Sequence, residues 1–300
     1  MRRHILITFC VTVLIAAAWT LQAQPKAMVH AASTDPSSPD RETGEDMVIG
    51  GRDVTVWRPE TEGPAPVILF SHGFGACATH SAFLTSALAG AGYLVIAPRH
   101  ADAGCATPAR GTIARPMAPF TIPTVWSDTT WHDRREDIVA IWEALRHDPA
   151  FADRIDRTKL AVMGHSVGGY TALGLAGAWP SWRLPDVKAV VALSPSCLPF
   201  LVPEGGLGAL SAPVAFQGGT RDFAITPLLI RPRGCFDRIR GTARLVVFRH
   251  IDHYAWTDPH SKARAHMIAH ARDFLDRHVR GLSPSPPLRR RRGVALMLAK

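Results

Sequence analysis

The sequence predicts an α/β fold with a mostly parallel central sheet, helices on both faces and no large cap domain. Short apolar runs of strand type alternate with helical patterns along most of the chain. Several of these runs are apolar at every position, which is typical of strands buried on both faces of a sheet. Only about twenty residues separate the strands predicted at 187–193 and 213–216, so a large helical insertion does not fit there.

The predicted strands follow one another through the central part of the chain. We predict strands at residues 54–57, 66–70, 93–97, 159–163, 187–193, 213–216 and 244–249. Helices are predicted at 81–90, along the apolar stripe Trp131–Leu145, after residue 168, and from about 258 to 278. The segment Pro98–Thr130 is rich in proline and lacks periodicity, so we expect a functional or disordered loop.

Composition divides the chain into four parts. Residues 1–23 resemble a secretory signal peptide, because Arg2 and Arg3 precede a short apolar run and a small-residue cleavage site. Cleavage near Ala31 and an uncleaved anchor remain alternatives. We expect a disordered leader at 24–46, one catalytic domain at 47–281 and a flexible basic tail at 282–300. This organisation predicts a secreted or periplasmic protein.

The formal net charge of +9 is concentrated at the two ends of the chain. Three basic residues lie at positions 2, 3 and 26, and five lie after residue 288, so the part between is nearly balanced. This distribution gives no basic nucleic-acid surface. The tail is expected to be a solvated extension, and contact with an anionic envelope surface is the minority alternative. We expect a monomer.

Four cysteines remain if Cys10 is removed with the signal, and export permits disulfides among them. Four cysteines allow three pairings. We favour Cys77–Cys105 and Cys197–Cys235, because the members of each pair lie in loops at the same edge of the predicted sheet.

A G-x-S-x-G pattern at Gly164–Gly168 follows the strand that begins at Lys159 and precedes small residues suited to a helix packed on a sheet. In this arrangement the serine lies on a strained strand-to-helix turn, and its hydroxyl projects from the carboxyl end of the sheet. The flanking glycines are needed because the turn brings backbone segments too close for side chains. Ser166 is therefore the predicted nucleophile.

A serine hydroxyl needs a neighbouring base, and the base needs a carboxylate that orients it. Ser166, Asp222 and His253 follow the order nucleophile, acid, histidine, and each lies just after a predicted strand. We expect them to meet at one edge of the sheet. Asp252 and His250 are the rivals, but Asp252 is adjacent to His253 in sequence and His250 lies at the strand end.

An acyl-transfer intermediate needs two preset backbone donors for its oxyanion. We expect the N–H of Val167, directly after the nucleophile, and the N–H of Phe74, in the glycine-rich loop after residues 66–70. His72 is assigned a structural role in the same loop. Phe74, His165 and Trp256 are candidates for the acyl pocket, with core packing as the alternative for each.

No metal site or nucleotide cofactor is expected. His266 and His270 are four apart on a predicted helix, but the glutamate of zinc proteases is missing beside the first histidine, so we assign both to a solvated helix face. His100, Asp102 and Cys105 share a loop without recognisable ligand spacing. No P-loop or dinucleotide-binding fingerprint follows any predicted strand.

Four stretches in order resemble the α/β-hydrolase superfamily over roughly residues 48–280. They are Phe70–Gly75, Gly164–Gly169, Gly218–Asp222 with Ile225–Pro227, and His253–Thr257. Within the superfamily the chain looks like dienelactone-hydrolase-like esterases, related to platelet-activating-factor acetylhydrolases and cutinase-type polyester hydrolases. True dienelactone hydrolases use a cysteine nucleophile, so Ser166 favours ester hydrolysis over lactone opening. The resemblance implies the same Ser166–His253–Asp222 triad.

The sequence thus predicts a secreted serine carboxylic ester hydrolase acting on small-molecule or polymeric esters through an acyl-enzyme. A lipase, a polyester hydrolase or a peptidase on the same triad remains an alternative. A catalytically inactive scaffold that binds a partner is the alternative from a different functional class.

Overall fold

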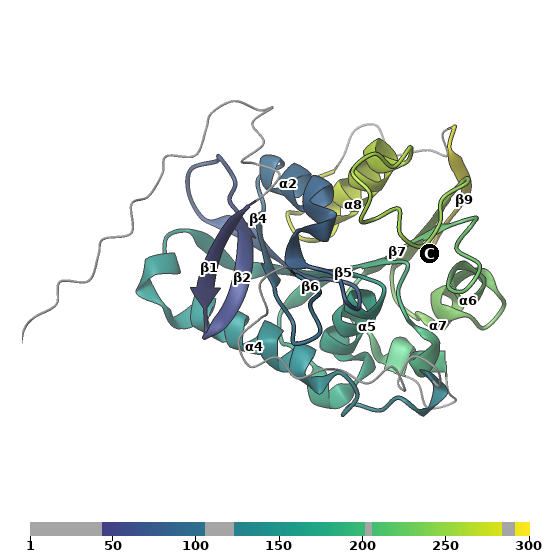
Figure 1. Cartoon of the computed structure of the whole chain (residues 1–300), viewed down its shortest axis with the longest axis horizontal. Helices are drawn as coiled ribbons and strands as arrows, with labels where there is room; N and C mark the ends of the chain where they lie inside the picture. Colours follow the sequence, from purple (N-terminus) through teal and green to yellow (C-terminus); the bar gives the residue numbers. More distant parts are fainter. Residues whose placement is uncertain (1–43, 106–122, 202–205, 284–291) are drawn as a thin grey trace, which may run out of the picture. The chain divides into compact units, whose positions relative to one another are not determined.

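The computed structural model describes residues 44–105, 123–201, 206–283 and 292–300. A nine-stranded sheet with the order β1-β2-β4-β3-β5-β6-β7-β8-β9 forms its centre (Figure 1). The strands are β1 (Glu45–Ile49), β2 (Arg52–Trp57), β3 (Ala65–Ser71), β4 (Leu94–Pro98), β5 (Ile155–His165), β6 (Val187–Leu193), β7 (Val214–Gly219), β8 (Ala243–Phe248) and β9 (Val294–Ala299). β3 to β8 pair in parallel, whereas β1, β2 and β9 pair antiparallel at the edges. The predicted fold class is confirmed.

Helices cover both faces of the sheet. They are α2 (Ala82–Gly90), α4 (His132–His147), α5 (Val167–Leu173), α6 (Thr226–Ile230), α7 (Cys235–Arg238) and α8 (Arg264–His278). α2 and α8 pack on one face, and α4, α5, α6 and α7 pack on the other (Figure 1). Short 3-10 turns lie at Ala78–Ser81, Pro123–Val125, Pro149–Phe151, Pro180–Trp182, Leu198–Leu201 and Gly206–Ala209, and a π turn at Gly174–Ala178.

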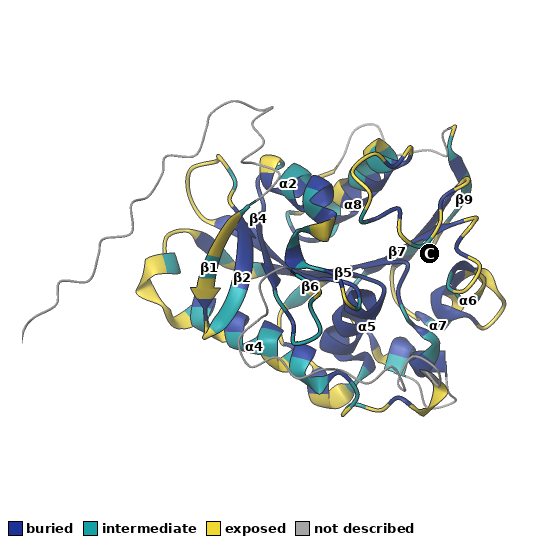
Figure 2. Ribbon diagram, viewed as in Figure 1, coloured by how far each residue is buried: buried dark blue, intermediate teal, exposed yellow. Residues whose placement is uncertain are grey.

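Two hydrophobic cores lie above and below the sheet. Successive strand residues point to opposite faces, so Val67 and Leu69 of β3 join the core under α4 and α5. Ile68 and Phe70 of the same strand join the core under α2 and α8. The central strands are therefore buried on both faces, which explains their continuous apolar sequences (Figure 2).

The edge strands differ from the sequence-based expectation. The flexible tail predicted at 282–300 is wrong for Val294–Ala299, because these residues form β9 and pair with β8. Val294 is buried, and the backbones of Ala243 and Lys300 exchange two hydrogen bonds of 2.9 Å. β1 begins at Glu45, within the predicted leader, and α8 begins at Arg264, six residues after the expected start. β9 was not predicted because it follows the run of arginines at 289–292, and β1 was not predicted because it begins with two acidic residues.

Both expected disulfides are present in the structure. Cys77–Cys105 joins the loop after β3 to the loop after β4, with the two Cα atoms 5.2 Å apart. Cys197–Cys235 joins the loop after β6 to α7, with a Cα–Cα distance of 6.4 Å. Each bridge ties down a loop at the carboxyl edge of the sheet, where the predicted site residues lie.

Several predictions fall outside the described residues. These include the signal peptide, residues 24–43 of the leader and residues 106–122 of the long loop. Among the helices of the described ranges, none has both the length and the apolar character needed to cross a bilayer. The segment between β6 and β7 contains only short turns in its described part, in agreement with the absence of a large insertion there.

Candidate active site

Ser166 occupies the turn between β5 and α5 with φ 56° and ψ −117°, a conformation that is costly for a residue with a side chain. Its N–H donates to the carbonyl of Leu193, and its own carbonyl accepts from Tyr170 and Ser196. These three hydrogen bonds hold the turn in place, so Ser166 keeps its strained backbone conformation. The structure therefore contains the strained strand-to-helix turn predicted from the sequence.

Close backbone contact explains the two glycines of the motif. A Cβ on Gly164 would overlap the carbonyl of Gly168, and a Cβ on Gly168 would overlap the carbonyl oxygen of Ser71 at the end of β3. Both obstacles are backbone atoms, which cannot rotate away. Any side chain at either position would displace the turn that carries Ser166.

The structure brings Ser166, His253 and Asp222 together. His253 Nε2 lies 3.0 Å from Ser166 Oγ, and His253 Nδ1 lies 3.1 Å from Asp222 Oδ2. The three residues follow β5, β8 and β7, whose carboxyl ends share one edge of the parallel sheet. The imidazole can therefore accept a proton from the serine hydroxyl while the carboxylate holds its other nitrogen.

The rival residues have other roles in the structure. The Asp252 carboxylate accepts a hydrogen bond of 3.0 Å from the N–H of Tyr254, which stabilises the loop itself. His250 is exposed at a turn with φ 60°, and its N–H donates to Thr220 Oγ1 over 2.7 Å. Neither residue forms part of the Ser166–His253–Asp222 chain of hydrogen bonds.

Ser194, which the sequence-based reasoning missed, extends this series of hydrogen bonds at Asp222. It lies directly after β6, is fully buried, and its hydroxyl donates to Asp222 Oδ2. The Ser194 hydroxyl oxygen lies 3.0 Å from His253 Nδ1, so it also accepts a hydrogen bond from the imidazole. Its position at the end of the strand between those of Ser166 and Asp222 was the available signal.

The environment keeps the Asp222 carboxyl ionised. Burial acts to raise its pKa, but hydrogen bonds from His253 and Ser194 outweigh burial and bring the pKa below its ordinary value. The N–H of Ile225 also donates to this carboxylate, over 3.3 Å. An ionised acceptor at this point fixes the His253 tautomer that carries its proton on Nδ1.

The two expected oxyanion donors flank Ser166. Val167 is the first residue of α5, directly after the serine. Phe74 lies in the loop after β3, and a Cβ built on its neighbour Gly73 would be 3.6 Å from Ser166 Cβ. The Phe74 ring is partly buried and packs edge-on against Trp131, with the centroids 5.6 Å apart. The loop thus adjoins Ser166.

The assignment of His165 and Trp256 to an acyl pocket is wrong, because both are buried below the surface. Trp256 is fully buried in the core under α2 and α8, and its Nε1 donates to Gln217 Oε1 over 3.0 Å. His165 stacks on Trp256, and its Nε2 donates to the carbonyl of His253 over 2.8 Å. His165 therefore supports the His253 loop from behind.

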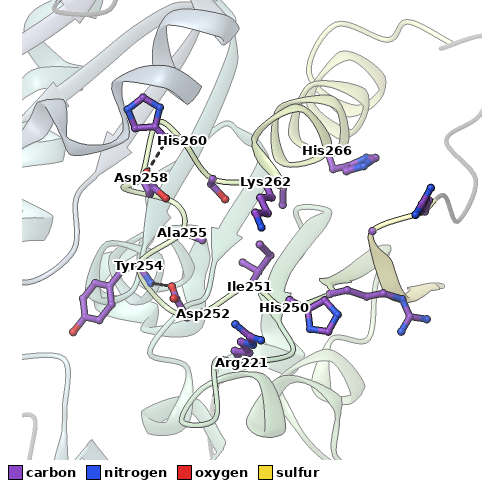
Figure 3. Close-up of a pocket in the computed structure, with 15 residues that line it drawn as sticks. Arg221, His250, Ile251, Asp252, Tyr254, Ala255, Asp258, His260, Lys262 and His266 are labelled. Carbon is purple, nitrogen blue, oxygen red and sulfur yellow. Dashed lines mark hydrogen bonds between the residues drawn. The ribbon is translucent and has the colours of Figure 1, made fainter.

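A cavity of about 1430 Å³ lies beside this site and is lined by the loops that follow β7 and β8, the start of α8 and the residues just before β9 (Figure 3). Its lining includes Arg221, Asp252 and Tyr254, the sequence neighbours of Asp222 and His253, but neither of those two residues nor Ser166. Figure 3 shows basic side chains from several segments around the hollow. The cavity is therefore separate from the Ser166 hydroxyl.

No group of three His, Cys, Asp or Glu side chains in the described ranges is arranged to hold a metal ion. His270 is buried beside Phe248 in the core, which corrects its assignment to a solvated helix face. His100 and Asp102 are engaged with protein side chains, namely Ser71, Asp137 and Arg134.

The mostly parallel nine-stranded sheet, with helices on both faces and a serine turn after β5, is an α/β-hydrolase fold. A family model described as platelet-activating factor acetylhydrolase, isoform II, matches residues 55–112. Cutinase 2 of Thermobifida cellulosilytica and cutinase cut1 of Thermobifida fusca are each 28% identical to the chain over 178 residues. The matches cover 56% of this chain, and 63% and 52% of those two proteins.

A solved structure agrees on the fold. The crystal structure of a protein described as a predicted CIB-like hydrolase from Thermoplasma acidophilum matches with a TM-score of 0.55 and 16% sequence identity. The match covers 77% of this chain and 96% of that chain. The sequence and structural matches together fit an α/β-hydrolase family of esterases, as the sequence motifs indicated.

Replacing Gly168 with alanine tests the close contact at the turn. We expect Gly168→Ala to lower the free energy of unfolding by about 3 kcal/mol or more, because the new Cβ would overlap the Ser71 carbonyl. Urea unfolding followed by circular dichroism measures the change. Gly90→Ala in α2 is the matched control, since a Cβ there meets nothing within 4 Å. Equal stability of the two variants would contradict this account.

The buried histidine behind the site predicts a pH dependence of stability. Burial, followed by repulsion from His253, lowers the pKa of His165 from 6.5 to about 3. Between these values the unfolded chain binds a proton at His165 that the folded chain does not, so the free energy of unfolding falls as the pH falls below about 6.5. We expect His165→Gln to make this slope shallower.

Urea unfolding at a series of pH values between 7 and about 4 measures the slope. His147→Gln, at an exposed histidine of α4, serves as the control for the substitution of a histidine by glutamine. If His165→Gln left the slope unaltered, His165 would titrate alike in the folded and the unfolded chain, which would contradict the lowered pKa of the buried histidine.

Proposed function

We propose that the protein is a serine carboxylic ester hydrolase that works through an acyl-enzyme on Ser166. The observation that carries the proposal is the continuous chain of hydrogen bonds from Ser166 Oγ through His253 to Asp222. The matches to proteins named cutinase and to the acetylhydrolase family support ester cleavage as the reaction. The activity is a proposal for this chain, which aligns with only part of each cutinase.

In the proposed acylation step, Ser166 Oγ attacks the ester carbonyl carbon while its proton passes to His253 Nε2. The carbonyl oxygen becomes an oxyanion, held by the N–H groups of Phe74 and Val167. The C–O bond to the alcohol then breaks as the proton on His253 is delivered to the leaving oxygen. Asp222 keeps its charge throughout and stabilises the imidazolium.

In the deacylation step, water takes the place of the alcohol. His253 accepts a proton from the water as it attacks the acyl carbon, and the bond to Ser166 Oγ breaks with return of that proton to the serine. The acid product leaves, and the enzyme is regenerated. The histidine thus acts as base and then as acid in each half-reaction.

Polymeric esters are the second candidate substrates. Phe223 follows Asp222 and is 80% exposed, and Tyr254 follows His253 and is 73% exposed. Two exposed aromatic side chains directly beside the acid and the histidine favour contact with an extended apolar substrate. The relatives named cutinases support the same class. A panel of nitrophenyl esters of increasing acyl length, with a polyester film included, distinguishes this class from short-chain esters.

We also propose that the protein acts outside the cytoplasm. Two disulfides support this, because such bridges persist mainly in oxidising compartments. The predicted signal peptide at residues 1–23 agrees with it. Cell fractionation with detection of the mature amino terminus tests the proposal, and a protein found only in the cytoplasm with Met1 intact would contradict it.

Covalent labelling tests the nucleophile directly. We expect a fluorophosphonate probe to modify Ser166 in the native protein, and Ser166→Ala to abolish labelling and lower nitrophenyl ester hydrolysis about a thousandfold or more. Peptide mapping by mass spectrometry identifies the labelled residue. Ser211→Ala, at an exposed serine, is the control. Full activity in Ser166→Ala would refute the mechanism, and an unlabelled, inactive native protein would favour the scaffold alternative.

Removing the Ser194 hydroxyl tests the acidic end of the chain of hydrogen bonds. Ser194→Ala removes one donor to the Asp222 carboxylate, and a hydrogen bond to a charged group contributes about 1.5–3 kcal/mol. We therefore expect kcat/KM for a nitrophenyl ester to fall about 10- to 100-fold. Ser196→Ala, two residues further along the loop, should stay within about twofold. Equal activities of the two variants would contradict the role of Ser194.

A further inference from the structure

Arg134 of α4 is fully buried and holds the loop that follows β3. Its Nη1 donates to the carbonyl of His72 over 2.6 Å and to Ser71 Oγ over 3.2 Å. Its Nη2 donates to the carbonyl of Gly73 over 3.3 Å. One guanidinium therefore contacts the last residue of β3 and the two carbonyls that precede Phe74.

The Gly73 carbonyl belongs to the same peptide unit as the N–H of Phe74. In a planar trans peptide the C=O and the N–H point in opposite directions, so holding one fixes the direction of the other. The Gly73 carbonyl accepts from Arg134, from His72 Nδ1 over 2.7 Å and from the N–H of Ala76 over 3.2 Å. Three donors on one side therefore hold the Phe74 N–H toward the opposite side.

The His72 contact requires a neutral ring with its proton on Nδ1. His72 Nε2 accepts from the N–H of His100 over 3.2 Å, so this nitrogen has no proton, and Nδ1 must be the donor to Gly73. Burial and then the charge of Arg134 hold the pKa of His72 well below its ordinary value, which keeps the ring neutral. The buttressing role expected for His72 thus has a defined hydrogen-bonding basis.

Asp102 orients the guanidinium. Arg134 donates to both of its carboxylate oxygens, from Nε over 3.1 Å and from Nη2 over 2.6 Å. Asp102 Oδ2 also accepts from the N–H of Gly75 over 3.2 Å, beyond Phe74 in the same loop. The loop is therefore held on both sides of Phe74, and the Cys77–Cys105 disulfide joins the two segments just outside these contacts.

We infer that the buried Arg134–Asp102 pair sets the oxyanion donor of the proposed esterase, by fixing the Gly73–Phe74 peptide so that the Phe74 N–H faces the acyl oxygen. The inference rests on the proposed function and adds two residues to it. Both act through the loop and not on the substrate, so they are positioning residues. The forked shape of the guanidinium is essential, because lysine cannot donate to two carbonyls and a bidentate carboxylate in fixed directions.

A double variant separates this role from simple loss of folding. Arg134→Met combined with Asp102→Asn removes both charges together, so neither is left buried without a partner. We expect kcat for a nitrophenyl ester to fall at least about tenfold, with KM within about twofold, because an oxyanion donor acts mainly in the transition state. The pH profile of kcat/KM should keep its shape, since His253 and Asp222 are unchanged.

The matched control is Arg244→Met combined with Asp273→Asn. This ion pair is also largely buried, but it joins β8 to α8. We expect the control to keep kcat even where its melting temperature falls as far as that of the Arg134–Asp102 variant. A similar loss of kcat in both would assign the effect to general destabilisation and overturn the inference.

Arg134→Lys is the second variant. Lysine keeps a positive charge beside Asp102 but loses the fork, so we expect a folded protein whose kcat is also reduced. Native kcat in a folded Arg134→Lys or double variant would overturn the inference, as would a displaced pH profile, which reports a disturbed His253. Failure of the proposed function looks different, because the native protein would then neither cleave the ester nor be labelled at Ser166.

Discussion

The start of α5 approaches the end of β3 so closely at Gly168 that a Cβ there would overlap the carbonyl oxygen of Ser71. This approach brings the turn that carries Ser166 next to the loop with Phe74, and the side chains of Arg134 and Asp102 hold that loop in place. Because the contact leaves no room for a Cβ, the turn can be closed only by glycine. The cost of the left-handed conformation at Ser166 is offset by two well-packed cores on either side of the sheet.

Polar side chains buried beneath the turn orient the peptide groups of the site. On one side His165 supports the His253 loop through a main-chain carbonyl, and on the other Arg134 supports the loop of Phe74 in the same way. Each side chain acts by fixing a peptide group and not by facing the substrate. All three nitrogens of the Arg134 guanidinium are hydrogen-bonded, and because losing a partner is costly for a buried polar group, this position tolerates little change.

Sequence patterns were sufficient for the central strands and for the meeting of Ser166, His253 and Asp222, because strand ends in a parallel sheet share an edge. They were insufficient for β9, whose pairing with β8 depends on a long-range register that a six-residue run does not encode. Arg134 was missed because an arginine on a helix carries no spacing signal, and only tertiary packing buries it. For Ser194 the only signal was its position directly after β6, which was not used. Trp256 was misassigned for the converse reason, since proximity to His253 in sequence does not determine which way a ring points.

The central claim is that Phe74 and Val167 present their N–H groups to an oxygen bound at Ser166. A crystal structure of the protein modified by a fluorophosphonate tests this most directly, because the tetrahedral phosphorus adduct places an oxygen where the oxyanion would lie. The account predicts that this oxygen lies about 2.7–3.1 Å from both nitrogen atoms. An adduct whose oxygen points into solvent, or toward neither N–H, would contradict it.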